Sequence, residues 1–398
     1  MNYLSNESKK LNNIITVLLL SFPIFARYFI VSDMVSIPEV LSFILLIYVL
    51  VLKNKNIKVD RALLQFILFI LTHTLVSLFF YPKEISIQIL GTSMRFIYLL
   101  ILLGVLAYNF FDIELGKKII ILITLILSVY AFIQYFYAKR GIILTTYLPG
   151  LKHFDTTGIY KNTDDILLDQ LNLGLEFRPR SLLNEPAHFA TYIISSLTIV
   201  LFDNRETKNS YFLIGLILSS ACLLSKSSTA IIMMFIIWII YIYTSIVEGS
   251  NKDMIIIILI LLSILIIYSS TSGFKTIDYF INRTFGNTRK LSGITNSSRF
   301  GTLGKSFDNF NSILNVIVGK GNIKIETYLS GLFRLFYNFG LAGVVFYSNW
   351  VIKSLNGETK LQKCLIFVFL IMNIGTEVMF GYFMYLYIPF IFHKKYYT

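Results

Sequence analysis

The chain alternates between long apolar runs and short polar segments, and this pattern predicts its fold. Runs such as 231–246 and 254–268 consist almost entirely of aliphatic, aromatic and methionine residues. They approach the roughly 20 residues that a helix needs to cross about 30 Å of hydrocarbon. Hydrophobic residues make up 56% of the 398 positions and charged residues only 14%, more apolar surface than a soluble domain buries. The pattern therefore predicts an all-α polytopic membrane protein.

We expect one integral membrane domain, residues 1–398, with about 12 transmembrane helices. The expected spans are 11–31, 37–52, 62–81, 88–108, 119–138, 186–202, 210–224, 229–248, 254–269, 328–349, 361–377 and 379–393. The last two are the most ambiguous, because 361–393 also fits one long span followed by a re-entrant piece.

The basic residues indicate how these spans are oriented. The net charge of +13 would suit a nucleic-acid partner, but its placement favours membrane topology instead. Short outer turns hold little beyond Lys83 and Lys226. Cytoplasmic loops of membrane proteins carry an excess of Lys and Arg. We therefore expect a protein of the cell (cytoplasmic) membrane with both termini in the cytoplasm. The basic residues on the inner side are Lys9, Lys10, Lys53, Lys55, Lys58, Arg61, Lys117, Lys118, Arg205, Lys208, Lys353, Lys360, Lys363, Lys394 and Lys395.

Two long segments, 139–184 and 270–327, interrupt the rhythm of spans and short turns. Both are external in this topology. Loops of this length are uncommon unless they are functional or disordered. The second is rich in arginine and lysine, and a cationic surface beside the membrane suits a phosphate or diphosphate ligand. The alternative is a solvated loop near anionic lipid headgroups.

The sequence gives no sign of a disulfide, a metal site or a nucleotide site. Cys222 and Cys364 both fall within apolar spans, and the four histidines lack ligand spacing. No glycine loop of the phosphate-cradling kinds is present either. We therefore expect no cofactor and no metal.

The segment RPRSLLNEPAHFATYII (178–194) places polar chemistry at the start of the sixth span. Pro186 suits the first helical position, so Asn184 or Glu185 is the expected helix cap. His188 lies about one turn beyond Glu185 on the same helical face. Glu185 and His188 are thus the candidate catalytic residues. An interfacial helix cap with amphipathic neighbours is the alternative interpretation.

Arginines near this segment and within spans are the candidate anion ligands. Pro179 keeps its surroundings extended, so Arg178 and Arg180 point to different sides and Arg180 is closer to Glu185. Arg95 and Arg334 lie inside expected spans, where ionisable residues are costly and usually face an interior or a cavity. Either could instead pair with a buried acid or snorkel to the interface.

Three segments together resemble a known family. RPRSLLNEPAHFATY resembles the arginine, small residue and Glu-Pro-x-x-x-Ala signature of bacterial surface-polysaccharide polymerases of the Wzy type. LSKSSTA (224–230) resembles their Ser/Arg-rich turn two spans later, with Lys226 in place of the usual arginine. The stretch SSRFGTLGKSFDNFNSILNVIVGKGN and the following LFRLFYNFGLAG resemble the second large external loop, with its Gly-x-Gly turn and Gly-Leu-x-Gly helix. The resemblance covers about residues 90–350.

The resemblance implies an integral glycosyltransferase of the O-antigen polymerase/ligase superfamily. Such enzymes join oligosaccharide repeat units carried on undecaprenyl diphosphate at the outer face of the cytoplasmic membrane, without a nucleotide sugar or metal. The product would be O-antigen of lipopolysaccharide, capsule or exopolysaccharide, and a chain-length regulator and a flippase would act in the same pathway. The implied diphosphate or glycan ligands are Arg180, Arg299 and Arg334, with Arg178, Lys226 and Arg289 as lesser candidates. Glu185 or His188 would assist the acceptor hydroxyl.

Two other functions compete with a polymerase. The related ligases carry a histidine in the second loop or the following helix, whereas residues 270–349 contain none. A lipid-linked oligosaccharide flippase would also have about twelve spans, but such carriers typically show internal repeats and charges within spans. Here no repeat of the two halves is evident, and most outer charge lies in the two long loops. A non-catalytic scaffold is a further alternative.

Overall fold

A computed structural model describes most of the chain and shows a helical protein. The residues that it describes are 2–29, 35–52, 57–153, 177–203, 208–247, 289–291, 294–296, 310, 312–323, 329–354 and 359–392. A short antiparallel hairpin, β1 (Arg289–Leu291) and β2 (Ile294–Asn296), accompanies the helices.

The helical elements follow one another in the order of the expected spans. They are α1 (Asn2–Phe25), α2 (Ile37–Leu52), α3 (Arg61–Phe80), α4 (Lys83–Leu102), the π-helix η2 (Leu103–Ala107), α5 (Tyr108–Phe110), α6 (Ile113–Ala138), α8 (Pro186–Phe202), α9 (Lys208–Ser225), α10 (Ser228–Val247), α14 (Ile313–Val318), α15 (Gly331–Ser354), α16 (Lys360–Gly375), the 3₁₀ turns η4 (Val378–Phe380) and η5 (Tyr382–Leu386), and α17 (Ile388–Ile391).

Length and composition identify the described helices as those of a membrane protein. Five of them are long and apolar enough to cross a membrane, and several others are apolar but shorter. The helical class predicted from the sequence is thereby confirmed, and these helices support the expected membrane location. The number of twelve spans and their orientation stay predictions, and the expected span 254–269 lies outside the described residues. The five long spans are Arg61–Phe80, Lys83–Phe110, Ile113–Ala138, Ser228–Val247 and Gly331–Lys353.

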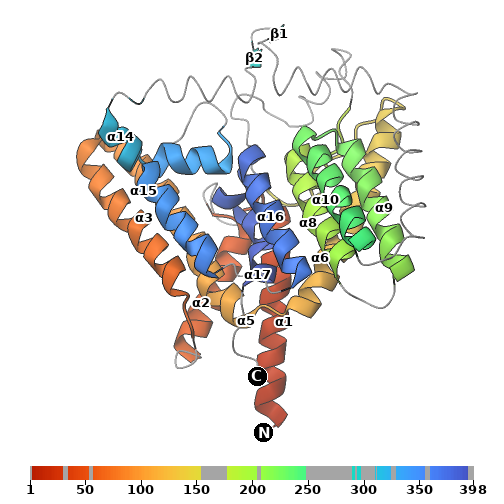
Figure 1. Cartoon of the computed structure of the whole chain (residues 1–398), viewed down its shortest axis with the longest axis horizontal. Helices are drawn as coiled ribbons and strands as arrows, with labels where there is room; N and C mark the ends of the chain where they lie inside the picture. Colours follow the sequence, from red (N-terminus) through yellow and green to blue (C-terminus); the bar gives the residue numbers. More distant parts are fainter. Residues whose placement is uncertain are drawn as a thin grey trace.

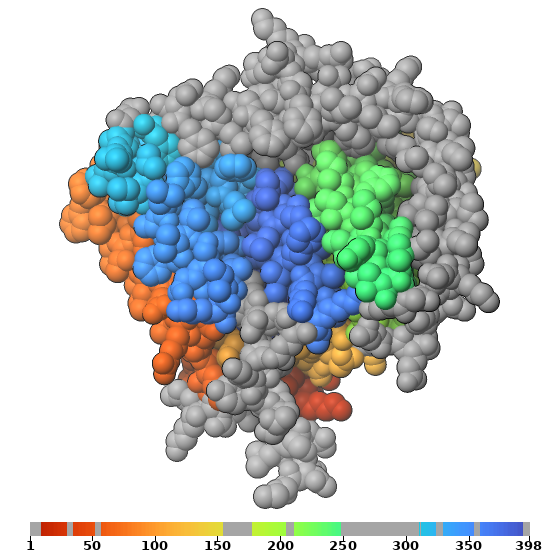
Figure 2. Space-filling view, viewed as in Figure 1, coloured from red at the N-terminus to blue at the C-terminus, as the bar shows by residue number. Residues whose placement is uncertain are grey.

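The helices stand side by side, with the chain passing repeatedly from one end of the molecule to the other (Figure 1). Helix α1 begins at the lower end in that view, whereas α14 and the β1–β2 hairpin lie at the upper end. On the face shown in Figure 2, α16 lies between α15 and α10, and it contacts both. The described parts of the expected second long segment, α14 and the hairpin, thus lie at the end opposite to the start of α1.

The last expected span, 379–393, is not a regular helix. After α16 the chain continues through η4, η5 and the four-residue α17. The break is stabilised because other groups bind the backbone it frees: the Asn373 side chain accepts the Met379 N–H at 2.8 Å, and Gly331 N–H donates to the Thr376 carbonyl at 2.8 Å. Irregular backbone at membrane depth requires such internal partners. The expectation of a regular twelfth helix was therefore wrong for this segment.

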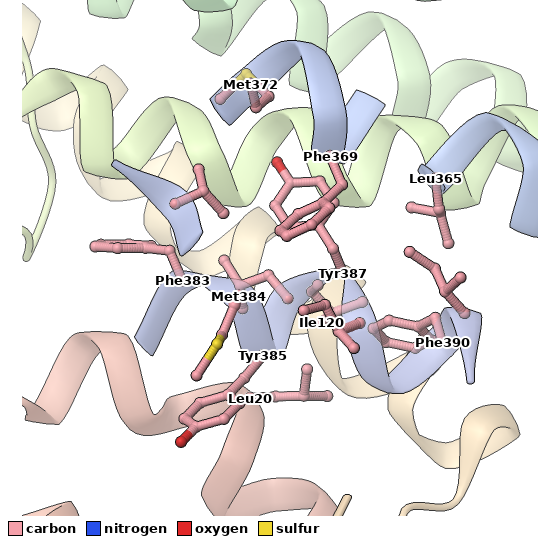
Figure 3. Packing of buried hydrophobic residues seen from close by; sticks show 14 of the residues in the cluster. Leu20, Ile120, Leu365, Phe369, Met372, Phe383, Met384, Tyr385, Tyr387 and Phe390 are labelled. Carbon is pink, nitrogen blue, oxygen red and sulfur yellow. The ribbon is translucent and has the colours of Figure 1, made fainter. Parts of the chain in front are cut away.

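This broken segment, 376–387, runs into the centre of the protein. Figure 3 shows Phe383, Met384, Tyr385 and Tyr387 packed among side chains from α1, α6 and α16. Tyr387 is fully buried, and its hydroxyl donates to the Thr191 carbonyl of α8 at 3.2 Å. Burial of so many aromatic rings fixes the position of the irregular backbone.

Gly319 and Gly340 allow the end of the second long segment to pack closely against α15. Helix α15 is kinked at Gly340, where φ is 63°, and a Cβ there would collide with the Ile317 carbonyl. At Gly319, where φ is 85°, a Cβ would lie 2.5 Å from the Asn338 carbonyl. The kink frees the carbonyls of Tyr337 and Asn338, which accept the N–H groups of Lys320 and Gly321 at 2.9 Å each. Only glycine combines this backbone conformation with so close an approach.

Candidate active site

A cavity of about 1090 Å³ is lined by residues from the N-terminal, central and C-terminal parts of the chain. Its walls come from the end of α1, the first half of α2, the middle of α4, the start of α8, the start of α15 and the segment 376–387. Three arginines, two glutamates and an imidazole line it: Arg27, Arg95, Arg334, Glu39, Glu377 and His188. With the imidazole neutral, the three arginines exceed the two carboxylates by one positive charge, which favours an anionic ligand.

Arg334 is held on the α15 side of the cavity. Its Nη1 donates to the Glu377 carboxylate at 2.5 Å, and its guanidinium carbon lies 5.1 Å from the centre of the Phe380 ring. The Nε of Arg334 is buried without a hydrogen-bond partner among the described residues. A buried donor of this kind is costly to leave unsatisfied, so the arrangement retains capacity for an additional acceptor. The sequence prediction that Arg334 faces a cavity agrees with this placement.

Arg95 is held by a glutamate in a similar way. Its Nε donates to Glu39 at 2.8 Å, joining the middle of α4 to the start of α2. The other oxygen of Glu39 accepts the backbone N–H and the hydroxyl of Ser36, at 2.8 and 2.7 Å. Glu39 therefore fixes the first turn of α2 and Arg95 together. Both Arg95 and Arg334 line the cavity and also pair with an acid, which is buried in the case of Glu39 and partly exposed in the case of Glu377.

Arg27 is the most buried of the three cavity arginines. Only 4% of this residue is exposed, and Nη1 donates to the carbonyl of Thr146 at 2.7 Å. Thr146 belongs to the start of the first long segment, so this bond ties that segment to the end of α1. Arg27 also lies in electrostatic range of His188.

His188 and Glu185 sit at the first turn of α8, as the sequence predicts. Glu185 is the N-cap residue and Pro186 follows at the helix start, although no side-chain oxygen of Glu185 caps the helix. His188 lines the cavity and stacks on Phe383, with ring centres 4.6 Å apart. Glu185 is exposed and is not among the described residues lining the cavity, but it lies in electrostatic range of both His188 and Glu377.

Arg180 supports the wall behind this turn. It is 8% exposed, and its Nη1 donates to the carbonyl of Asn184 at 2.9 Å. Asn184 lines the cavity, and its side-chain oxygen is buried without a hydrogen-bond partner among the described residues. Arg180 itself is not among the described lining residues, so its expected contact with a diphosphate stays a prediction.

Arg178 and Lys226 are brought together, although 48 positions separate them. Nη2 of Arg178 donates to the Lys226 carbonyl at 3.0 Å. Lys226 has a φ of 49°, a left-handed conformation that ends α9 and turns the chain into α10. Ser181, with φ of 55°, is fixed by Gln134 of α6, whose side-chain oxygen accepts its N–H at 2.9 Å. The two short motifs, 178–194 and 224–230, are therefore connected to each other in the structure.

The expected ligands from the second long segment fall largely outside the described residues. Arg299 lies there, and for Arg289 only the backbone, paired with Asn296 in the β1–β2 hairpin, is described. Asn322 does reach the cavity: its carbonyl accepts from Thr92 of α4 at 2.5 Å, and its side chain bonds to Asn338.

The sequence analysis missed Arg27, Glu39, Glu377, Asn184 and Asn322 as cavity residues. A usable signal existed for the glutamates, because each is a lone carboxylate among apolar residues, where ionisable groups mark functional or paired positions. Within the described part of the chain, no group of three or more histidine, cysteine or acidic side chains gathers as metal ligands do. Comparisons of the chain with protein-family models, curated proteins and solved structures found no match.

Proposed function

We propose that the protein is a surface-polysaccharide polymerase that joins oligosaccharide repeat units carried on a lipid diphosphate. The single observation that best supports this is the cavity that Arg27, Arg95, Arg334 and His188 line together. Arginine makes permanent, bidentate contacts with phosphate oxygens. A lipid-linked glycan already carries its leaving group, so the protein's task is to position two chains and stabilise departing charge.

In the proposed reaction the acceptor sugar hydroxyl attacks the anomeric carbon of the donor glycan. A carbon–oxygen bond forms there, the bond from that carbon to the diphosphate breaks, and the lipid diphosphate leaves with the electron pair. His188, on the cavity wall, accepts the hydroxyl proton. Glu185, in electrostatic range of that imidazole, stabilises its charged form. The arginines neutralise the diphosphate as charge develops on it.

The proposal includes an orientation and a membrane. The cavity would open toward the external face of the cytoplasmic membrane, with about twelve spans, both termini inside, and 139–184 and 270–327 outside. Cysteines introduced at Thr163 and Asn296 should react with a membrane-impermeant reagent added to intact cells, whereas those at Lys55 and Lys208 should not. Labelling in the opposite sense would contradict the orientation and place the cavity on the wrong side for exported substrates.

A cellular assay of Arg334→Ala distinguishes the proposed polymerase from the related ligase and transporter. If joining is lost, cells at normal protein level should display single repeat units on the surface, because export and attachment still work. A ligase defect would leave long chains on the lipid carrier with none attached. A transporter defect would trap repeat units on the inner face. Either of the last two results would replace the polymerase assignment.

A lipid-linked oligosaccharide transporter is the second candidate, and one observation favours it. The kink at Gly340 and the irregular segment 376–387 are broken helices near the cavity, and such helices are frequent at the binding sites of secondary transporters. Purified protein in liposomes separates the two: a polymerase lengthens lipid-linked glycans when donor and acceptor are on one side, whereas a transporter only moves them across.

A further inference from the structure

The cavity has an opening at the side of the protein, between α2 and α4. Val35, Phe43 and Met94 line the cavity and are 42, 54 and 39% exposed, and Phe43 and Met94 share a helix face with the exposed Ile47 and Leu90. A side chain that belongs both to a cavity wall and to the outer surface marks the edge of an opening. This edge is apolar, and the neighbouring outer face of α2 is apolar as well, so in a bilayer the opening faces hydrocarbon.

The lining combines apolar and charged side chains. Val40 and Leu99 add to its apolar part. The Arg95 side chain, 45% exposed, lines the same cavity as Arg334. This combination of apolar and charged lining suits a molecule with a long hydrocarbon chain at one end and an anionic group at the other.

Helix α2 is joined to α4 across this opening by polar contacts. Glu39 binds Arg95, and the Tyr98 hydroxyl contacts the Ser42 hydroxyl at 2.7 Å and donates to the Glu39 carbonyl at 2.9 Å. An anionic headgroup that binds Arg95 competes with the Glu39 carboxylate for the same guanidinium. When the headgroup replaces the Glu39 carboxylate on Arg95, one of the contacts that attach α2 to α4 is lost. Headgroup binding is therefore coupled to the attachment of α2.

We propose that the opening between α2 and α4 admits the hydrocarbon chain of a lipid whose phosphate or diphosphate headgroup binds Arg95 inside, with Glu39 occupying Arg95 until that headgroup arrives. The inference rests on the proposed function for the lipid's role as a substrate, but binding of the lipid is measurable without any glycan transfer.

Gly91 provides a direct test of the opening. It lines the cavity, and a Cβ added to it would meet no atom within 4 Å. Gly91→Trp should fill the opening without disturbing the helix, whereas Gly91→Ala should leave it open. The probes are radiolabelled farnesyl diphosphate and inorganic diphosphate, bound to the full chain in phosphatidylcholine nanodiscs.

We expect the wild-type protein to bind farnesyl diphosphate about tenfold or more tightly than inorganic diphosphate, because the apolar chain is buried. Gly91→Trp should remove this advantage and keep the affinity for inorganic diphosphate, and Gly91→Ala should behave as wild type. Equal binding of both probes to the wild type, or an unchanged advantage in Gly91→Trp, would overturn the inference while leaving the polymerase proposal intact. Absence of binding by either probe would contradict the anion cavity, and with it both proposals.

A photo-crosslinking experiment avoids any dependence on the tryptophan variant. A benzophenone amino acid replaces Phe43 at the opening or, as control, Val129 of α6, which is 55% exposed and apolar. Farnesyl diphosphate should label the chain from position 43 several-fold more than from position 129, and excess inorganic diphosphate should reduce only the former. Equal labelling at both positions would indicate simple partition into the bilayer and would refute the opening.

Discussion

The two arginine–glutamate pairs of the cavity have the same chemistry but different supports. Arg334 and Glu377 belong to a wall whose backbone is fixed by the Gly331–Thr376 hydrogen bond and by aromatic packing around 383–387. Arg95 and Glu39 join α4 to α2 at an opening where the arginine side chain is 45% exposed. In our proposals the first pair belongs to a fixed wall that positions charge, and the second belongs to an adjustable wall that admits a ligand. Position in the fold, rather than residue type, separates their roles.

The largest expected effect comes from replacing His188, the proposed proton acceptor, which packs against the fixed wall. His188 stacks on Phe383 of that wall. His188→Gln should lower the rate of glycan joining in proteoliposomes by about 10²–10⁴-fold, the usual contribution of general acid–base catalysis. Glu185→Gln should lower it less, because Glu185 is not among the described cavity residues. The reverse ranking, at equal protein level, would make Glu185 the proton acceptor and His188 a support.

Replacing each cavity arginine by lysine compares the walls directly. Arg334→Lys should reduce joining by about 10²–10³-fold, because a point charge does not reproduce the guanidinium contacts at a developing charge. Arg95→Lys should cost far less, because its pair is partly exposed and exchanges partners in the proposed cycle. The ratio of the two rates, measured with the same donor and acceptor, decides the comparison. Equal losses would remove the distinction between a fixed and an adjustable wall.

Glycine substitutions extend the comparison to stability. Gly340→Ala should reduce the free energy of unfolding by about 1–3 kcal/mol, because alanine is strained at a φ of 63° and its Cβ meets the Ile317 carbonyl. Gly91→Ala, in an open part of α4, should leave stability unchanged or raise it by about 0.5–1 kcal/mol. Thermal unfolding in detergent measures both. A Gly340→Ala protein as stable as Gly91→Ala would show that the close packing of Gly319 and Gly340 does not stabilise α15.

The smallest expected effect concerns Glu39. Glu39→Gln removes the carboxylate charge that competes for Arg95, so inorganic diphosphate should bind a few-fold more tightly, by about the strength of a partly exposed ion pair. Glu84→Gln, which removes an exposed charge from the first turn of α4, is the matched control and should change binding little. Weaker binding in Glu39→Gln than in Glu84→Gln would show that Glu39 assists the anion rather than replacing it.

Local patterns predicted the helices and the start of α8 well. Pro186 begins α8 where proline preferences place it, and Glu185 is one of the two cap positions that the sequence left open, because such signals depend on neighbouring residues alone. Hydrophobic runs likewise identified most described helices. The segment 379–393 was misjudged, because its break depends on Asn373 and on Gly331, which lies 48 positions before Met379.

The cavity was predicted only in part, for a related reason. His188 was expected at a site because it lies one turn beyond Glu185 on the same helix face, and Arg334 because it is ionisable within an expected span. The acids that hold the arginines were not, because Glu39 is 56 positions from Arg95 and Glu377 is 43 from Arg334. Pairing over such distances depends on helix packing, which hydrophobic periodicity does not encode.

The close packing of Gly319 against Gly340 has a mechanical consequence. Because the backbone of 317–321 meets the kink of α15 at these two glycines, a displacement of that stretch is transmitted to the half-helix that bears Arg334. In the proposed function, a polymer bound to the second long segment would thereby act on the Arg334 guanidinium in the cavity.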